Sequence, residues 1–173
     1  MKKIVIILVI LLALSLGCTE VKDDGTTMLE FTKLKQDYNV KESYSPDIII
    51  MNDYINDLSK LRAESSIFVS KILDAELASA QSFYYLLIAH EKSREVDFFP
   101  SPCSIQKVRN SKEYLETIKF TSLSINKSNA AVDLLASLSA TELEHLRPNQ
   151  LLLVKQYSAG AKGLESELGK ICS

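Results

Sequence analysis

The residues best suited to metal or acid–base chemistry are few and stand far apart in the chain. Glu142 and His145 have the Glu-x-x-His spacing, which puts a carboxylate and an imidazole on one face of a helix and which di-iron bundles use twice. This chain has no second pair of that kind, so a solvated pair near a helix start explains Glu142 and His145 better than a metal site. His90 lies in phase with Phe83 and Leu86, which predicts a histidine at the edge of a core, bonded to a nearby polar group.

Other catalytic patterns are missing from the sequence. Serine is abundant, but no serine has an evident histidine and aspartate partnership, and the chain lacks a Gly-x-Ser-x-Gly elbow, a glycine-rich phosphate loop and a haem-attachment motif. We therefore predict no enzyme activity, no catalytic or metal-ligating residues and no cofactor. Asn126-Lys127-Ser128 fits the N-glycosylation sequon, which makes Asn126 a candidate modification site in an organism that glycosylates exported proteins.

The amino terminus has the composition of an export signal. Lys2 and Lys3 precede an apolar run from Ile4 to Leu14, and the small residue Gly17 stands directly before Cys18. The segment from Ile4 to Gly17 is shorter than the ~20 residues that a permanent membrane-spanning helix needs. Cleavage before Cys18 is therefore favoured over retention of the segment.

Residues 14–18, Leu-Ser-Leu-Gly-Cys, resemble the lipobox of bacterial and some archaeal lipoproteins. Gly17 and Cys18 match that motif well, whereas Ser15 stands where the family usually has leucine, so the fit is to its looser form. The resemblance covers only Met1 to Cys18. It implies removal of residues 1–17, a diacylglyceryl group on Cys18, and an extracytoplasmic protein held at the cell envelope by lipid. An uncleaved signal anchor or an ordinary signal peptide are the alternatives, and both keep the body outside the cytoplasm.

The rest of the chain has the size and charge of one mildly acidic domain. Removing residues 1–17 takes away Lys2 and Lys3 and shifts the formal net charge from −2 to −4. No run of lysine or arginine exceeds two residues, which argues against a nucleic-acid partner. Attachment to the membrane must then come from acyl chains rather than from a basic surface.

The three cysteines are consistent with export. If Cys18 carries lipid, Cys103 and Cys172 remain as a pair that can form a structural disulfide in an oxidising compartment. Two buried free thiols are the alternative. A metal site is disfavoured because neither Cys103 nor Cys172 has another cysteine or a histidine two to four residues away.

Glycine and proline usage predicts an all-α fold. There is no glycine between Gly25 and Gly160, and the prolines occur only at positions 46, 100, 102 and 148. Long segments without either residue favour a few long helices. We expect a flexible tether over residues 18–27 and a single helical-bundle domain over residues 28–173. It would comprise a short helix over 28–38 and an antiparallel bundle of three long helices over 46–97, 102–138 and 141–171.

Local signals support these boundaries. Thr27 with Glu30 and Thr141 with Glu144 have the spacing of capping boxes, and Ser45-Pro46 is typical of a helix start that Tyr44 could staple to Ile49. A break near Ser65-Ser66 is compatible with the length of the first long helix.

Pro148 is a competing start for the last helix. A turn near residues 139–140 is favoured, with Pro148 as a kink, because it returns Cys172 to the level of Cys103.

Two function classes remain. The first is a lipid-anchored helical module that acts at the envelope in structure or in interaction with a protein partner. The alternative is a ligand-binding or sensory bundle with a small polar pocket, which would require a cavity among Ser65, Ser79, Ser122 and Asn126.

Overall fold

The computed structural model describes residues 22–97 and 104–171, and every regular element in those ranges is a helix. The expected all-α bundle is therefore confirmed. The helices are α2 (Asp24–Asp37), α3 (Ile48–Ala63), α4 (Ile67–Ser93), α5 (Ile105–Arg109), α6 (Lys112–Ser137), α7 (Ala140–Leu143) and α8 (Gln150–Leu168).

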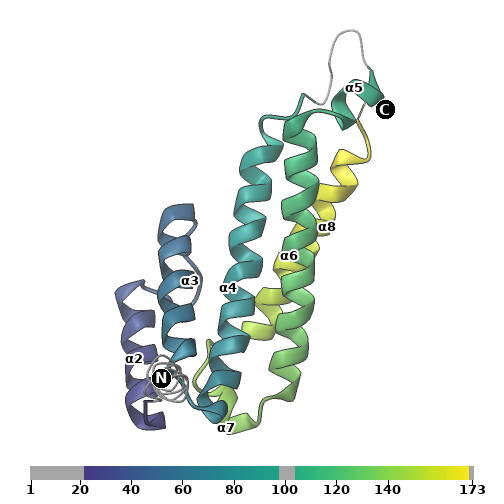
Figure 1. The fold of residues 1–173 in the computed structure, drawn as a ribbon. Helices are drawn as coiled ribbons and strands as arrows, with labels where there is room; N and C mark the ends of the chain where they lie inside the picture. The colour runs from purple at the N-terminus through teal and green to yellow at the C-terminus, as the bar shows by residue number, and fades with distance from the viewer. Residues whose placement is uncertain (1–21, 98–103, 172–173) are drawn as a thin grey trace, which may run out of the picture.

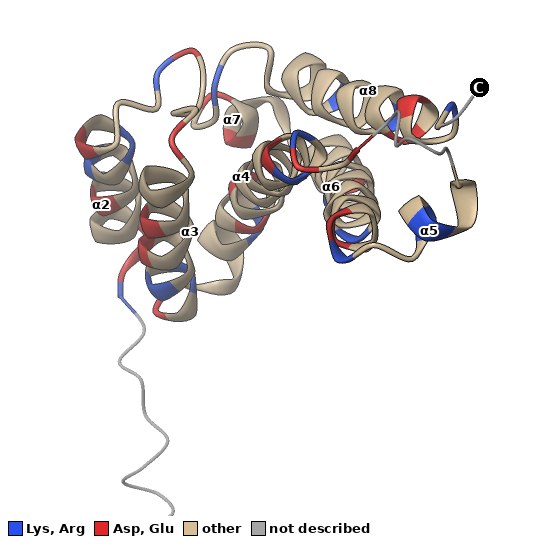
Figure 2. Ribbon diagram, turned by 90° about the horizontal axis from the view of Figure 1, so that it is seen from above, with Lys and Arg blue, Asp and Glu red and all other residues tan. Residues whose placement is uncertain are grey.

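Helix α4 occupies the centre of the arrangement. It packs against α6 and α8 on one side and against α3 on the other, while α2 lies outside α3 (Figure 1). The view from above in Figure 2 shows the same order and shows acidic and basic residues interleaved around the helices. The start of α4 and helix α7 lie at one end of the bundle, and α5 lies at the other (Figure 1).

The expected helix over residues 46–97 is divided into two helices. α3 ends at Ala63 and α4 begins at Ile67, so the break falls at the serine pair where the sequence allowed one. Ser65 donates its hydroxyl to the carbonyl oxygen of Arg62, and the Ser66 hydroxyl accepts from the backbone N–H of Val69. Serine side chains compete for backbone hydrogen bonds in this way and thereby end one helix and cap the next.

The amino-terminal helix starts four residues earlier than expected, which shortens the predicted tether. Asp23 caps α2 by accepting a hydrogen bond from the backbone N–H of Thr26, and Thr27 is fully buried within the helix. Residues 24–27 are therefore folded and are not a flexible linker. Similarly, α3 is capped by Asp47 and not by Ser45, because the Asp47 carboxylate accepts from the backbone N–H groups of Ile49 and Ile50.

The two later helices also differ from the prediction. The expected helix 102–138 consists of the short α5 and the long α6, which ends at Ser137 as anticipated. The expected helix 141–171 is wrong at its start, because α8 begins only at Gln150, after Pro148. Between them, Ser139 and Glu142 form a reciprocal capping box around the short helix α7, in place of Thr141 and Glu144.

Two groups of apolar residues form the core. The larger group joins α2, α3, α4, α6 and α8, and its most deeply buried large side chains include Phe31, Met51, Tyr54, Leu58 and Ile72. A smaller group lies at the α5 end and comprises Val96, Val108, Leu168 and Ile171. Both ends of the central three helices are thus held by packed apolar side chains.

Serine residues line the contact between α4 and α6. The Ser82 hydroxyl donates to the carbonyl oxygen of Ser124 at 3.2 Å, and the Ser124 hydroxyl donates to the carbonyl oxygen of Ser82 at 2.9 Å. Ser82 also bonds the Ser128 hydroxyl at 2.5 Å, and all three side chains are buried. Because side chains this small let two backbones approach closely, Ser124 and Ser128 form a packed helix contact, whereas Ser122 and Asn126 lie on the exposed face of α6.

This contact predicts a position-specific response to added volume. Ser124→Leu should lower the free energy of unfolding by about 2 kcal/mol or more, because a buried site with no spare space must separate the helices. Ser122→Leu, on the exposed face of the same helix, should change it by no more than about 0.5 kcal/mol. Urea denaturation of both variants measures the difference, and equal effects would contradict the close contact.

Candidate functional site

The most concentrated polar chemistry in the described residues surrounds a carboxylate inside the bundle. Glu76 lies on α4, three and four residues after the core residues Leu73 and Ile72, and its side chain is fully buried. Because Glu76 occupies a position in the apolar stripe of α4, its side chain points into the core. A buried carboxylate is expensive unless donors surround it, so its partners decide whether the bundle is stable.

Three side chains donate hydrogen bonds to the Glu76 carboxylate. The hydroxyl of Tyr54, on α3, donates to Oε1 at 2.8 Å, and the hydroxyl of Tyr44, in the segment before α3, donates to the same oxygen at 3.0 Å. The side-chain amide of Gln150, the first residue of α8, donates to Oε2 at 2.9 Å. Both carboxylate oxygens are therefore engaged, and each of the three donors comes from a different segment.

Arg147 supplies the opposite charge through Gln150. Its Nε donates to Oε1 of Gln150 at 2.8 Å, and its guanidinium carbon lies 3.6 Å from the centre of the Tyr44 ring. The two terminal guanidinium nitrogens are buried and make no hydrogen bond of ordinary geometry, although the guanidinium group interacts with the hydroxyl of Tyr157. The charge of Arg147 is thus stabilised by the stacked ring of Tyr44 and by Gln150, which hydrogen-bonds both Arg147 and the Glu76 carboxylate.

The electrostatics of the cluster keep both tyrosines protonated. Burial, and then the neighbouring Glu76 carboxylate, raise the pKa of Tyr44 and of Tyr54 well above its ordinary value. Each hydroxyl therefore remains a donor at neutral pH. Glu76, Tyr44 and Tyr54 are at most 3% exposed, so no solvent-sized molecule reaches the carboxylate and the cluster acts as a crosslink rather than a reaction centre.

Sequence reasoning missed this cluster. Tyr44 was expected to staple to Ile49, but Tyr44 is buried beside Glu76 while Ile49 is 73% exposed. One local signal was present: a glutamate three and four residues from Leu73 and Ile72 in an otherwise apolar helical stripe.

Glu142 and His145 were expected to be a solvated pair, but Glu142 is buried and only His145 is exposed. The Glu142 carboxylate accepts the backbone N–H of Ser139 at 2.6 Å, and this hydrogen bond lowers the pKa of Glu142. His145 is exposed, and its carbonyl oxygen accepts from Lys35 at 2.5 Å. Among the residues that the structure describes, no group of three or more histidine, cysteine, aspartate or glutamate side chains is placed to hold a metal ion.

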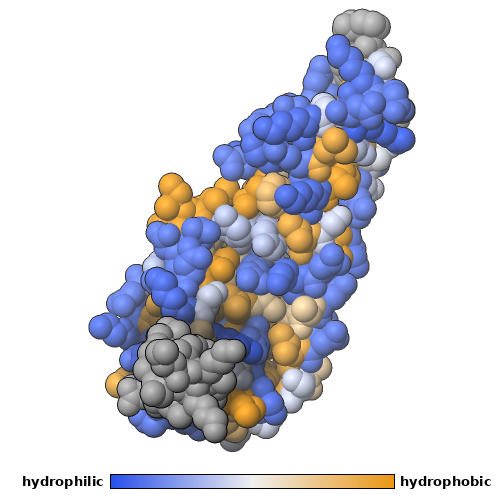
Figure 3. Space-filling model, in the orientation of Figure 1, coloured by the Kyte–Doolittle hydropathy of each residue, from blue (hydrophilic) through white to orange (hydrophobic). Residues whose placement is uncertain are grey.

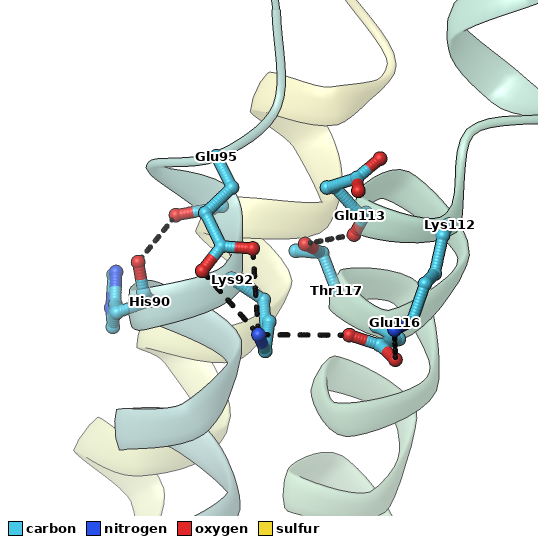
Figure 4. Close-up of polar contacts among 8 residues, drawn as sticks. His90, Lys92, Glu95, Lys112, Glu113, Glu116 and Thr117 are labelled. Atoms are coloured by element: carbon cyan, nitrogen blue, oxygen red, sulfur yellow. Dashed lines mark hydrogen bonds and ion pairs between the residues drawn. The ribbon is translucent and has the colours of Figure 1, made fainter.

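His90 lies on the surface rather than at the edge of the core. Its ring is exposed, while its carbonyl oxygen accepts from the Ser93 hydroxyl at 2.8 Å. Nearby, Lys92 lies 3.4 Å from Glu95 and 3.7 Å from Glu116, so it bridges α4 to α6 (Figure 4). Such exposed ion pairs contribute only ~0–1 kcal/mol each.

The four residues expected around a polar pocket do not share a cavity. Ser79 is completely buried and donates to the carbonyl oxygen of Ala75, whereas Ser122 and Asn126 are on the exposed face of α6. Ser65 lies in the turn between α3 and α4. Asn126 is accessible for the predicted glycosylation, which stays a prediction.

An apolar depression lies between α6, α7 and α8. It has a volume of about 290 Å³ and is lined by Leu135, Ala136, Leu143, Leu146, Arg147, Pro148, Asn149, Gln150 and Leu151. The terminal nitrogens of Arg147 are not accessible from it. It is therefore an apolar surface groove and not a binding site for an anion on the guanidinium group.

The three predicted cysteine sites lie outside the described residues. These are Cys18, the expected lipidation site, and Cys103 and Cys172, the expected disulfide. Ile171, which precedes Cys172, packs in one apolar cluster with Val108, five residues after Cys103. The segments that flank the two cysteines therefore meet at the α5 end of the bundle, and the disulfide stays a prediction.

Removing the charge of Glu76 should destabilise the whole domain. Glu76→Gln puts an amide donor where three donors converge and leaves Arg147 without its counter-charge, so we expect a loss of about 3 kcal/mol or more. Asp74→Asn, two residues away, breaks only the exposed pair with Arg62 and should cost no more than ~1 kcal/mol. Thermal or urea unfolding followed by circular dichroism checks both variants; similar losses would contradict the role assigned to Glu76.

Comparison with known proteins adds no family to this description. No protein-family model, no curated protein and no solved structure matches the chain.

Proposed function

We propose that the protein is a lipid-anchored, extracytoplasmic helical bundle that acts as an interaction or structural module at the cell envelope. The observation that carries this proposal is the segment ending in Leu16-Gly17-Cys18, with its preceding apolar run and its resemblance to a lipobox. Within the described ranges, none of the helices combines enough length with enough apolar character to span a bilayer.

The interior of the bundle supports an interaction role over a ligand-binding one. The polar residues between α4 and α6 bond each other and are buried, and the expected pocket residues do not converge. Exposed apolar side chains occur instead on the outside: Leu143 and Leu151 line the groove beside α7, and Leu152 is exposed next to it. Figure 3 shows that apolar and polar side chains alternate on one face of the molecule. Envelope modules that contact another protein need such a surface and no internal cavity.

A disulfide between Cys103 and Cys172 fits the same compartment. The described neighbours of both cysteines pack together at the α5 end, and an exported protein meets an oxidising environment. The bond would close the end of the bundle where α5 and the last turn of α8 hold only a small apolar cluster.

Replacement of Cys18 tests the proposed lipidation and membrane attachment. The parent should incorporate a labelled lipid precursor and remain with the membrane fraction, whereas Cys18→Ala should incorporate none, because only the thiol of that residue can form the thioether. Cys103→Ala serves as the matched control and should be labelled as the parent is. Continued labelling of Cys18→Ala, or no labelling of the parent, would contradict the proposal.

A further inference from the structure

The two most exposed neighbouring apolar side chains lie at the start of α4. Ile67 is 85% exposed and Phe68 is 57% exposed, although the helix they begin is otherwise the most buried in the bundle. Isolated exposed apolar residues are common on protein surfaces. Two adjacent large apolar side chains exposed at the start of a helix are less common. We therefore consider which parts of the chain lie beside them.

The amino-terminal end of the described chain is fixed to the same corner. The backbone N–H of Lys22 donates to the carbonyl oxygen of Glu64 at 3.0 Å, and the Ser66 hydroxyl bonds the Asp24 carboxylate. The Lys22 ammonium group lies 2.7 Å from Glu30 and 2.8 Å from Glu64. Ser66 is the residue directly before Ile67, so the chain enters the domain beside the exposed pair.

Covalent geometry then limits how far the anchor is from that corner. Cys18 precedes Lys22 by four residues, and a fully extended chain covers at most about 3.6 Å per residue, so the two Cα atoms lie within ~14 Å of each other. A diacylglyceryl group on Cys18 places this residue at the bilayer surface. The corner that carries Ile67 and Phe68 must therefore lie within a short distance of the lipid headgroups.

We propose that Ile67 and Phe68 insert into the surface of the bilayer that holds the lipid anchor. The proposal rests on the proposed lipidation of Cys18 and extends it, because two contacts fix the orientation of the domain where a single anchor leaves it free to turn. Insertion removes the two side chains from water, as the apolar face of an interfacial helix does. The opposite end of the bundle, with α5, then faces away from the membrane.

The charges around the corner indicate which lipids it meets. Asp23, Asp24 and Glu64 lie beside Lys22, so the corner is not basic. The insertion is therefore driven by apolar contact, and anionic lipid should not strengthen it.

Tryptophan fluorescence tests the insertion, because the parent chain contains no tryptophan. The full chain carrying Phe68→Trp is produced in lipidated form and placed in phosphatidylcholine vesicles whose acyl chains carry bromine. Leu115→Trp is the matched control. The exposed fraction of Leu115, 55%, is similar to that of Phe68, but Leu115 lies in the first turn of α6, at the α5 end of the bundle. We expect the tryptophan at position 68 to be quenched at least about threefold more than that at position 115 and to emit at shorter wavelength.

Two further measurements separate the outcomes. Adding Ile67→Asp to the Phe68→Trp chain should reduce the quenching, because a charge at the neighbouring position opposes insertion. Mass spectrometry of the same samples reports the lipid on Cys18. If lipid is present and positions 68 and 115 are quenched equally, the insertion alone is overturned. A shorter emission wavelength at position 68 without quenching would also overturn it, because it indicates that protein covers the side chain. Absence of lipid would overturn the insertion together with the proposed function.

Discussion

A single buried carboxylate holds together segments that the chain brings from far apart. Glu76 accepts hydrogen bonds from Tyr54, 22 residues away, from Tyr44, 32 residues away, and from Gln150, 74 residues away. Apolar packing alone does not specify which of several registers these segments adopt. A buried charge does so, because any arrangement that withholds a donor leaves it desolvated and unpaired. The segment before α3 and the start of α8 are therefore fixed relative to α4.

The hydrogen bonds to Glu76 also explain why two long connections at this part of the bundle are buried. Residues 38–47 and 144–149 contain little regular structure, yet Val40, Tyr44, Leu146 and Arg147 are buried. Arg147 stacks on Tyr44 and bonds Gln150, so the two connections contact each other around the carboxylate. The result is that the α2–α3 pair is attached to the three central helices by polar contacts as well as by apolar ones.

The sequence was most informative where local chemistry decides the structure. The absence of glycine and proline over long stretches predicted the helices, and Ser65-Ser66 indicated the break between α3 and α4 correctly. The predicted helix starts differ from the observed ones because several possible capping residues stand close together in the sequence. The caps are Asp23 and not Thr27, Asp47 and not Ser45, and Ser139 and not Thr141. The choice among such neighbours depends on which register buries the apolar face, and this is a property of the whole bundle.

The Glu76 cluster could not have been assembled from the sequence in the same way. Its one local signal is a glutamate in an apolar stripe, and a pattern of this kind does not identify distant donors. The polar middle of α6 presented a related difficulty, because its residue types favour a solvated face over a cavity wall. Ser122 and Asn126 do lie on a solvated face, whereas Ser124 and Ser128 are buried. Only the facing Ser82 shows that they form a close helix contact.

Native-state hydrogen exchange tests the central claim most directly, since it measures the free energy with which each segment opens. If Glu76 joins the outer helices to the central ones, the amides around Tyr54 in α3 should open only with the same free energy as the amides around Glu76 in α4. That result would mean that the two helices unfold as one unit. Exchange of α3 at a much lower free energy, with α4 still protected, would contradict the account.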